Sequence, residues 1–155
     1  MKKRFFLQIL VLVPILGIAM IMSCGSSPKF SDVVGKEWKL IEVRTGGKNI
    51  VFDRNTLSNE DAGDIFTMNF DAETISGTGA PNSYSAPYTL SSKQSISIMP
   101  VRSTMMAAIR QPEKLRENDF FTYMQNVSTW NLAKNNLELY SKTEDGGEVV
   151  LVFSL

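Results

Sequence analysis

The sequence predicts an α+β fold that is mainly antiparallel β, with a strongly curved sheet or open barrel packed on one α-helix. Short segments with alternating apolar residues recur after residue 37, and glycine, asparagine or aspartate separates them, which is typical of strands joined by tight turns. Only residues 112–127 carry apolar side chains at helical spacing. A lone amphipathic helix must bury its apolar face, and the concave side of a twisted antiparallel sheet offers that surface.

The first half of the chain predicts a series of short strands. Trp38, Leu40 and Val43 follow a pattern close to period two, and the glycines at 46 and 47 supply the next turn. The polar run 53–64 is predicted to be a surface loop. The predicted strands are residues 38–44, 49–52, 65–70, 74–76, 84–90 and 95–99.

Residues 112–127 are predicted to form the helix. Pro112 suits a first helical position, and Glu113 favours the positive end of the helix dipole. The apolar residues that share one side of this segment are Leu115, Phe120, Phe121, Tyr123, Met124 and Val127.

Two hairpins are predicted after the helix. Residues 129–132 and 137–140 pair across Asn135 and Asn136, a residue type that tolerates the positive φ of a tight turn. A second turn at residues 145–147 leads into the final strand, residues 149–153.

Residues 1–23 have the layout of a secretory signal peptide. A basic cap, residues 2–4, precedes an apolar run, residues 5–22. A retained anchor helix is the alternative, because such a run approaches the length that spans a bilayer, but Pro14 in its middle disfavours it.

The end of the apolar run resembles a bacterial lipobox. Ser23, a small residue, directly precedes Cys24, the one cysteine in the chain. A cysteine thiolate is the nucleophile that accepts a lipid as a thioether, and two or more acyl chains, such as palmitate, give stable anchoring. We therefore expect lipidation at Cys24, a tether over residues 24–33, and one domain over residues 34–155.

Composition excludes several classes of function. Three of the 16 basic residues and none of the 16 acidic ones lie in the signal, so the mature chain has a net charge of −3 and is a poor candidate for nucleic acid. A single cysteine forms no internal disulfide. Histidine is absent, which removes the commonest general base and transition-metal ligand. We expect no enzyme activity, no cofactor and no metal site.

Several short motifs, taken in order, resemble those of the META domain family of HslJ-like bacterial envelope lipoproteins. An opening at residues 35–40 contains Trp38, and a central signature at residues 77–88 is rich in glycine. A Thr-x-Met element, the helix and a paired ending follow. The residues that carry the resemblance are Trp38, Gly77, Gly79, Asn82, Tyr84, Tyr88, Thr104, Met106, Glu117, Phe120, Leu137, Leu139 and Phe153.

The resemblance also points to an absent disulfide. Many family members have one cysteine before the signature asparagine and another after the Thr-x-Met element, where this chain has Pro81 and Ala108. The resemblance implies that packing and hydrogen bonds hold the same loop here, with Pro81 stiffening it.

The polar motif residues have two interpretations. Asn82 and Thr104 either satisfy backbone groups in turns, which we favour, or contact a ligand. Five methionines also have two interpretations: they belong to the core, which we favour, or they line a soft apolar cleft. These methionines are Met68, Met99, Met105, Met106 and Met124.

The expected function is that of a non-enzymatic lipoprotein anchored in the cell envelope, in the outer rather than the inner membrane. The resemblance implies a role in envelope integrity, stress response or interaction with an envelope protein. The alternative is a small module that holds a hydrophobic ligand in an apolar cavity between sheet and helix. The sequence predicts no oligomeric state.

Overall fold

A computed structural model describes residues 28–60, 62–92, 94–107 and 114–155. Ten strands make one antiparallel sheet, whose main path follows the order β6-β5-β4-β3-β1-β10-β9-β8. The strands of this path are β1 (Glu37–Thr45), β3 (Thr67–Phe70), β4 (Thr74–Thr78), β5 (Ser83–Leu90), β6 (Ile96–Ile98), β8 (Val127–Ala133), β9 (Asn136–Lys142) and β10 (Glu148–Ser154). Two short strands lie off the path: β2 (Ile50–Val51) pairs with β1, and β7 (Arg102–Ser103) pairs with β5. The predicted fold class is confirmed.

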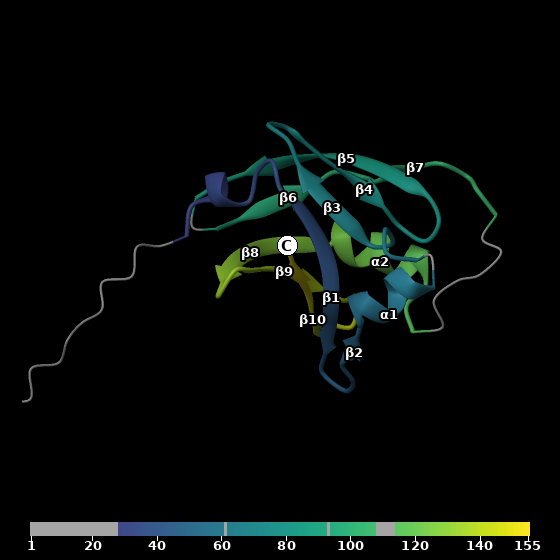
Figure 1. The fold of residues 1–155 in the computed structure, drawn as a ribbon. Helices are drawn as coiled ribbons and strands as arrows, with labels where there is room; N and C mark the ends of the chain where they lie inside the picture. The colour runs from purple at the N-terminus through teal and green to yellow at the C-terminus, as the bar shows by residue number, and fades with distance from the viewer. Residues whose placement is uncertain (1–27, 61, 93, 108–113) are drawn as a thin grey trace, which may run out of the picture.

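The sheet curls into a nearly closed barrel (Figure 1). Its two outer strands, β6 and β8, meet through an antiparallel bridge between Ser95 and Thr129. Beside this bridge, the Trp130 backbone N–H donates to the Gln94 carbonyl at 3.0 Å. Closure gives the terminal strands partners and leaves the alternating inward side chains to form one core.

One end of the barrel is covered by helix α2 (Glu117–Gln125). The Phe120 ring of α2 lies 5.0 Å from the Phe66 ring and 6.0 Å from the Tyr84 ring, measured between centroids. Figure 1 shows α2 and the shorter helix α1 (Arg54–Asn59) together on this side. Phe121 and Met124, which belong to the predicted apolar side of the helix, are also buried.

The opposite end of the barrel is filled by the 3-10 helix η1 (Phe30–Asp32). The Phe30 ring inserts among the rings of three residues on different strands, with centroid distances of 5.2, 5.6 and 4.9 Å to Phe70, Tyr88 and Trp130. The Trp38 indole N–H donates to the Val33 carbonyl at 2.9 Å. Within the described residues, Phe30 and Val33 therefore already pack with the barrel, although both precede residue 34.

The helix is shorter than the predicted range 112–127. Residues 112 and 113 lie outside the described residues, and Arg116 has an extended backbone with ψ of 147°. Val127 is the first residue of β8, paired with Ser141, so it is buried by the sheet and not by the helix. Leu115 is buried from an irregular segment.

The polar run 53–64 was expected to be loop, but it contains helix α1. Asp53 caps the helix: its carboxylate accepts from the Asn55 N–H at 3.0 Å and the Thr56 hydroxyl at 2.8 Å. These two bonds hold the pKa of Asp53 below its ordinary value. The run has no apolar period, so only this capping pattern indicates a helix.

The first predicted hairpin turn lies one residue earlier than expected. Lys134 and Asn135 adopt the positive φ values, 51° and 70°, and Asn136 is the first residue of β9. The second turn agrees with the prediction, with Gly146 at a φ of 82°.

We predict that Gly77→Ala destabilises the barrel by about 3 kcal/mol. A Cβ at Gly77 would lie 2.1 Å from the Thr67 carbonyl oxygen on the neighbouring strand, so the β3–β4 pair would have to separate. Urea unfolding measures the loss. Gly46→Ala is the matched control, because a Cβ there has no neighbour within 4 Å. Equal stability of the two variants would contradict the prediction.

Candidate functional site

A buried carboxylate organises the α2 end of the barrel. Glu117, the first residue of α2, is 7% exposed. Its Oε1 accepts from the backbone N–H groups of Ala80 and Asn82 at 2.5 and 2.7 Å. Its Oε2 accepts from the Asn82 side-chain amide at 2.6 Å. The first turn of a helix also favours negative charge, so the carboxylate is stabilised from two directions.

Asn82 extends this network to a third segment. Its side-chain oxygen accepts from the Thr104 hydroxyl at 2.9 Å and from the Met106 backbone N–H at 2.7 Å. Nearby, the Thr104 N–H donates to the Ser83 carbonyl at 3.0 Å. One asparagine side chain therefore joins the turn before β5, the chain after β7 and the start of α2. We call Asn82, Thr104 and Glu117 the Glu117 cluster.

The polar groups of the Glu117 cluster form hydrogen bonds with one another and with the neighbouring backbone. An uncompensated buried carboxylate costs several kcal/mol, so donors aimed at both oxygens are what makes burial tolerable. The Asn82 amide and carbonyl are both engaged within the protein. This arrangement supports the turn-stabilising interpretation of Asn82 and Thr104 over ligand contact.

Gly79 gives the carboxylate its space. A Cβ at this position would lie 2.5 Å from Glu117 Oε1 and 2.9 Å from Phe121 Cζ. The backbone of this turn also bonds locally: the Gly79 N–H donates to the Asn82 carbonyl at 2.6 Å, and its carbonyl accepts from the Phe66 N–H at 3.0 Å. A glycine is thus required where the turn approaches α2.

The resemblance implies that packing and hydrogen bonds, in place of a disulfide, hold the loop around Pro81, and the structure contains such hydrogen bonds. Pro81 lies inside the turn that Glu117 binds, after a cis peptide bond. Ala108 lies outside the described residues. The Asn82 side-chain oxygen accepts from Thr104 and Met106, so hydrogen bonds join the turn that contains Pro81 to residues 104–106.

The remaining motif residues are part of the core. The Tyr84 and Tyr88 hydroxyls both donate at 2.7 Å, to the carbonyls of Thr67 and Asp71. Burial raises the pKa of Tyr84 well above its ordinary value, which keeps the phenol as a donor. The motif residues with fully or almost fully buried side chains are Trp38, Phe120, Leu137, Leu139 and Phe153.

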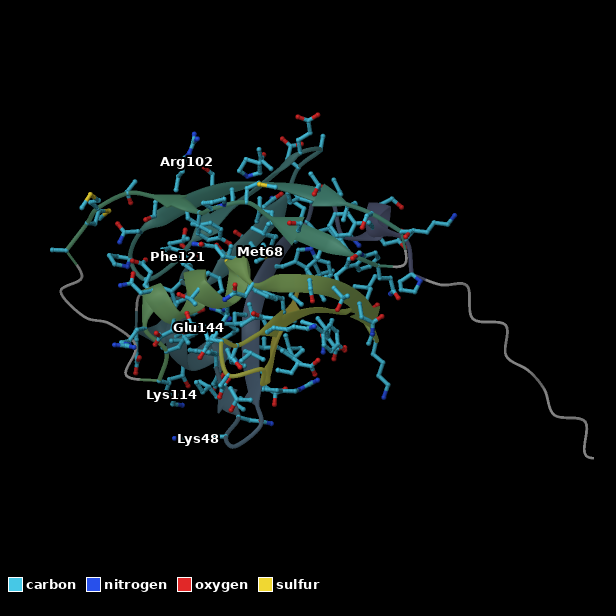
Figure 2. All side chains as sticks on the ribbon, turned by 180° about the vertical axis from the view of Figure 1, so that it is seen from behind. Lys48, Met68, Arg102, Lys114, Phe121 and Glu144 are labelled. Atoms are coloured by element: carbon cyan, nitrogen blue, oxygen red, sulfur yellow. The ribbon has the colours of Figure 1, made fainter. Side chains whose placement is uncertain are left out.

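The methionines do not gather in one cleft. Met68 and Met124 are fully buried, and Figure 2 shows Met68 inside the barrel. Met99, Met105 and Met106 are exposed, by 41%, 99% and 60%. Met106 joins the Glu117 cluster through its backbone and not its side chain.

Two hollows formed by the described residues do not match an apolar cavity. One, of about 330 Å³, is a shallow surface between β5 and β7, lined by Ser83, Ser85 and Arg102 among others. The second, of about 430 Å³, lies at the rim of the α2 end beside Tyr123 and includes Asp145. Aromatic rings occupy the contact between α2 and the barrel interior.

Neither a metal centre nor a membrane span is found in the described part of the chain. Over residues 28–60, 62–92, 94–107 and 114–155, no three side chains of the kinds that bind metals come together. In the same residues, no helix has the length and apolarity needed to cross a bilayer.

A second polar network lies on the outer face of the sheet. Glu138 of β9 accepts from Arg44 at 3.0 Å, from Tyr140 at 2.8 Å and from Asn131 at 3.4 Å. Burial raises the pKa of Glu138, but these hydrogen bonds outweigh it and hold the pKa below the ordinary 4.5. Val152, the cross-strand partner of Glu138, is fully buried.

Sequence patterns alone missed two parts of this architecture. Phe30 sits in a polar stretch with no period, and only its aromatic character distinguishes it. Arg54 of α1 donates to the carbonyls of Ile65 and Phe66 at 2.9 and 3.2 Å. Burial lowers the pKa of Arg54 to about 10, against the opposing effect of Glu37.

Comparison with known proteins identifies a family and solved structures with a similar fold. The META domain profile matches residues 31–154. The NMR structure of a protein from Burkholderia xenovorans has a TM-score of 0.58 and 14% identity, covering 99% of each chain. The crystal structure of a DUF4847 family protein from Bacteroides vulgatus has a TM-score of 0.53 and 14% identity, covering 81% of this chain and 95% of that one. At this identity the likeness shows the fold alone. No curated protein matches the sequence.

We predict that Glu117→Gln lowers the free energy of unfolding by about 2–3 kcal/mol. The amide keeps the size of the side chain, but its NH₂ group meets another donor, either the Asn82 amide or the backbone N–H groups. Urea unfolding measures the change. Glu144→Gln, on the exposed β9–β10 turn, should change stability by less than about 0.5 kcal/mol. If the two variants are equally stable, the cluster does not stabilise the fold.

A pH dependence follows from Glu138. Its native pKa is depressed, so its contribution to stability is complete above the unfolded value and is lost as the pH falls through the native pKa. The stability difference between the wild type and Glu138→Gln should therefore shrink on acidification below about pH 4.5. Urea midpoints of both proteins across this range test it. A stability difference between the two proteins that stays constant or grows as the pH falls would contradict the prediction.

Proposed function

Because the chain belongs to the META domain family, we propose that it is a non-enzymatic lipoprotein that presents one small domain at a bacterial envelope membrane. In this proposal, acylated Cys24 holds the protein to the lipid. The folded surface then serves a protein partner or the integrity of the envelope itself, including its response to stress. We propose the outer membrane as the membrane that holds the anchor.

The position of Cys24 is the observation that carries the anchor. It follows a basic cap, an apolar run and a small residue, the order that lipid attachment requires. It also precedes Phe30, which packs against the barrel, by only a few residues. An acyl chain at Cys24 would therefore leave the fold unobstructed, and two or more chains would give stable attachment.

The non-enzymatic part rests on the chemistry of the described side chains. Glu117, the buried charged residue of the described chain, has both carboxylate oxygens bound by donors of the protein itself. The sequence also lacks histidine. A general acid or base needs a titratable group that reaches a substrate, and Glu117 is enclosed by the turn it binds.

The alternative, a carrier of a hydrophobic ligand, has less support. Such a module needs an apolar cavity of a few hundred Å³. The ring of Phe121 lies 5.4 Å from that of Tyr84, and that of Phe120 lies 5.0 Å from that of Phe66. These contacts occupy the space where the ligand was expected.

We predict that Cys24→Ser abolishes incorporation of radioactive palmitate and releases the protein from the membrane fraction. A serine hydroxyl does not replace the thiolate that accepts the lipid. Fatty-acid labelling of cells that express each variant, followed by fractionation, measures both effects. Ser26→Ala, two residues further along, is the matched control and should keep its label. Equal labelling of Cys24→Ser and the wild type would refute the anchor.

A further inference from the structure

The two ends of the barrel differ in what they expose. The Phe30 end consists of η1 and the β3–β4, β5–β6 and β8–β9 turns, which follow from the antiparallel order of the strands. The α2 end consists of α1, α2 and the β1–β2 and β9–β10 turns. Figure 1 shows η1 and the β8–β9 turn on one side and both helices on the other. In Figure 2, Phe121 and Glu144 lie on the side away from η1.

The chain enters the fold rigidly at the Phe30 end. Phe30 contacts three rings of the barrel interior, and Val33, three residues later, is fully buried. Backbone bonds fix the same segment: the Gly35 N–H donates to the Phe70 carbonyl at 2.9 Å, and the Val33 carbonyl accepts from Trp38. Residues 30–36 therefore move with the barrel.

The chain between Cys24 and Phe30 is short. Six residue steps separate them, and a fully extended chain covers at most about 3.5 Å per step, or roughly 20 Å. β9 alone has seven residues, about 23 Å of strand. A domain attached at one end by so short a tether cannot present both ends equally to the surface that holds it.

We propose that the Phe30 end faces the phospholipid surface and that the α2 end faces away from it. This inference rests on the proposed lipidation of Cys24 and adds the orientation of the domain. The β3–β4, β5–β6 and β8–β9 turns then lie next to the headgroups. The α2 end, with the hollow beside Tyr123, faces the aqueous side, where a protein partner would meet it.

The charge of the Phe30 end indicates that the tether, rather than electrostatic attraction, sets this orientation. The described charged side chains of η1, its flanks and these turns balance. They are Lys29, Lys36 and Lys134 against Asp32, Asp71 and Glu73; Lys93, between β5 and β6, lies outside the described residues. A balanced surface gains little from an anionic membrane, and its weak interactions are screened by salt. The orientation should therefore be the same on neutral and anionic vesicles.

Energy transfer from a single dye to the membrane tests the orientation. Lys134→Cys and Glu144→Cys place a thiol on exposed turns at the two ends of β9. The chain has no other cysteine than Cys24, so after acylation the introduced thiol is the one free to react. The full-length protein is expressed, processed in cells, purified, labelled and reconstituted in phosphatidylcholine vesicles that contain an acceptor dye on lipid headgroups.

We expect severalfold higher energy transfer from position 134 than from position 144. As a control, about 20 Gly-Ser residues inserted after Ser27 should reduce the difference, because a flexible chain of that length lets the domain turn. Equal transfer from both positions, or higher transfer from 144, would overturn the orientation. The intact mass of the same samples reports acylation separately. A product without lipid would overturn the proposed anchor, whereas an acylated product with equal transfer overturns only the orientation.

Discussion

The carboxylate of Glu117 is the interaction on which the α2 end of this barrel depends. It accepts from three N–H groups, two on the backbone and one on Asn82, and Asn82 in turn binds the chain that follows β7. Burying a charge is unfavourable in itself, so the cluster is stable only if all these donors stay in place. The turn before β5, the segment after β7 and the start of α2 are therefore fixed together or not at all.

The barrel is closed at its other end by different means. Phe30 contacts three aromatic rings there, and the buried charged residue of the described chain, Glu117, lies at the α2 end. Apolar packing is less directional than hydrogen bonding, so this end fixes the position of the entering chain without requiring an exact polar geometry. The polar closure positions α2, and the apolar closure positions the chain that enters the barrel at Phe30. In the proposed lipid-anchored form, the attachment and the presented surface would lie at these opposite ends.

The sequence predicts the helices and strands whose apolar residues recur at a regular spacing and misses those that lack this spacing. Most strands were placed correctly because their inward side chains alternate, as Tyr84, Ala86 and Tyr88 do. The two residues of β7 pair with β5 through backbone hydrogen bonds, and such a short strand has no alternation of apolar and polar side chains in the sequence. The predicted helix was too long at its end because Val127 suits a helical face and a strand equally well. Glu117 was identified by resemblance, but its bonds to Ala80 and Asn82 depend on tertiary contacts more than 30 residues apart.

Hydrogen exchange of individual backbone amides, followed by NMR, tests the role of the buried carboxylate most directly. Turn and loop amides exchange quickly unless a stable acceptor protects them. Our account predicts that the amides of Ala80, Asn82 and Met106 are protected in the wild type and lose protection together in Glu117→Gln. Rapid exchange of these amides in the wild type, or protection that survives the substitution, would contradict it.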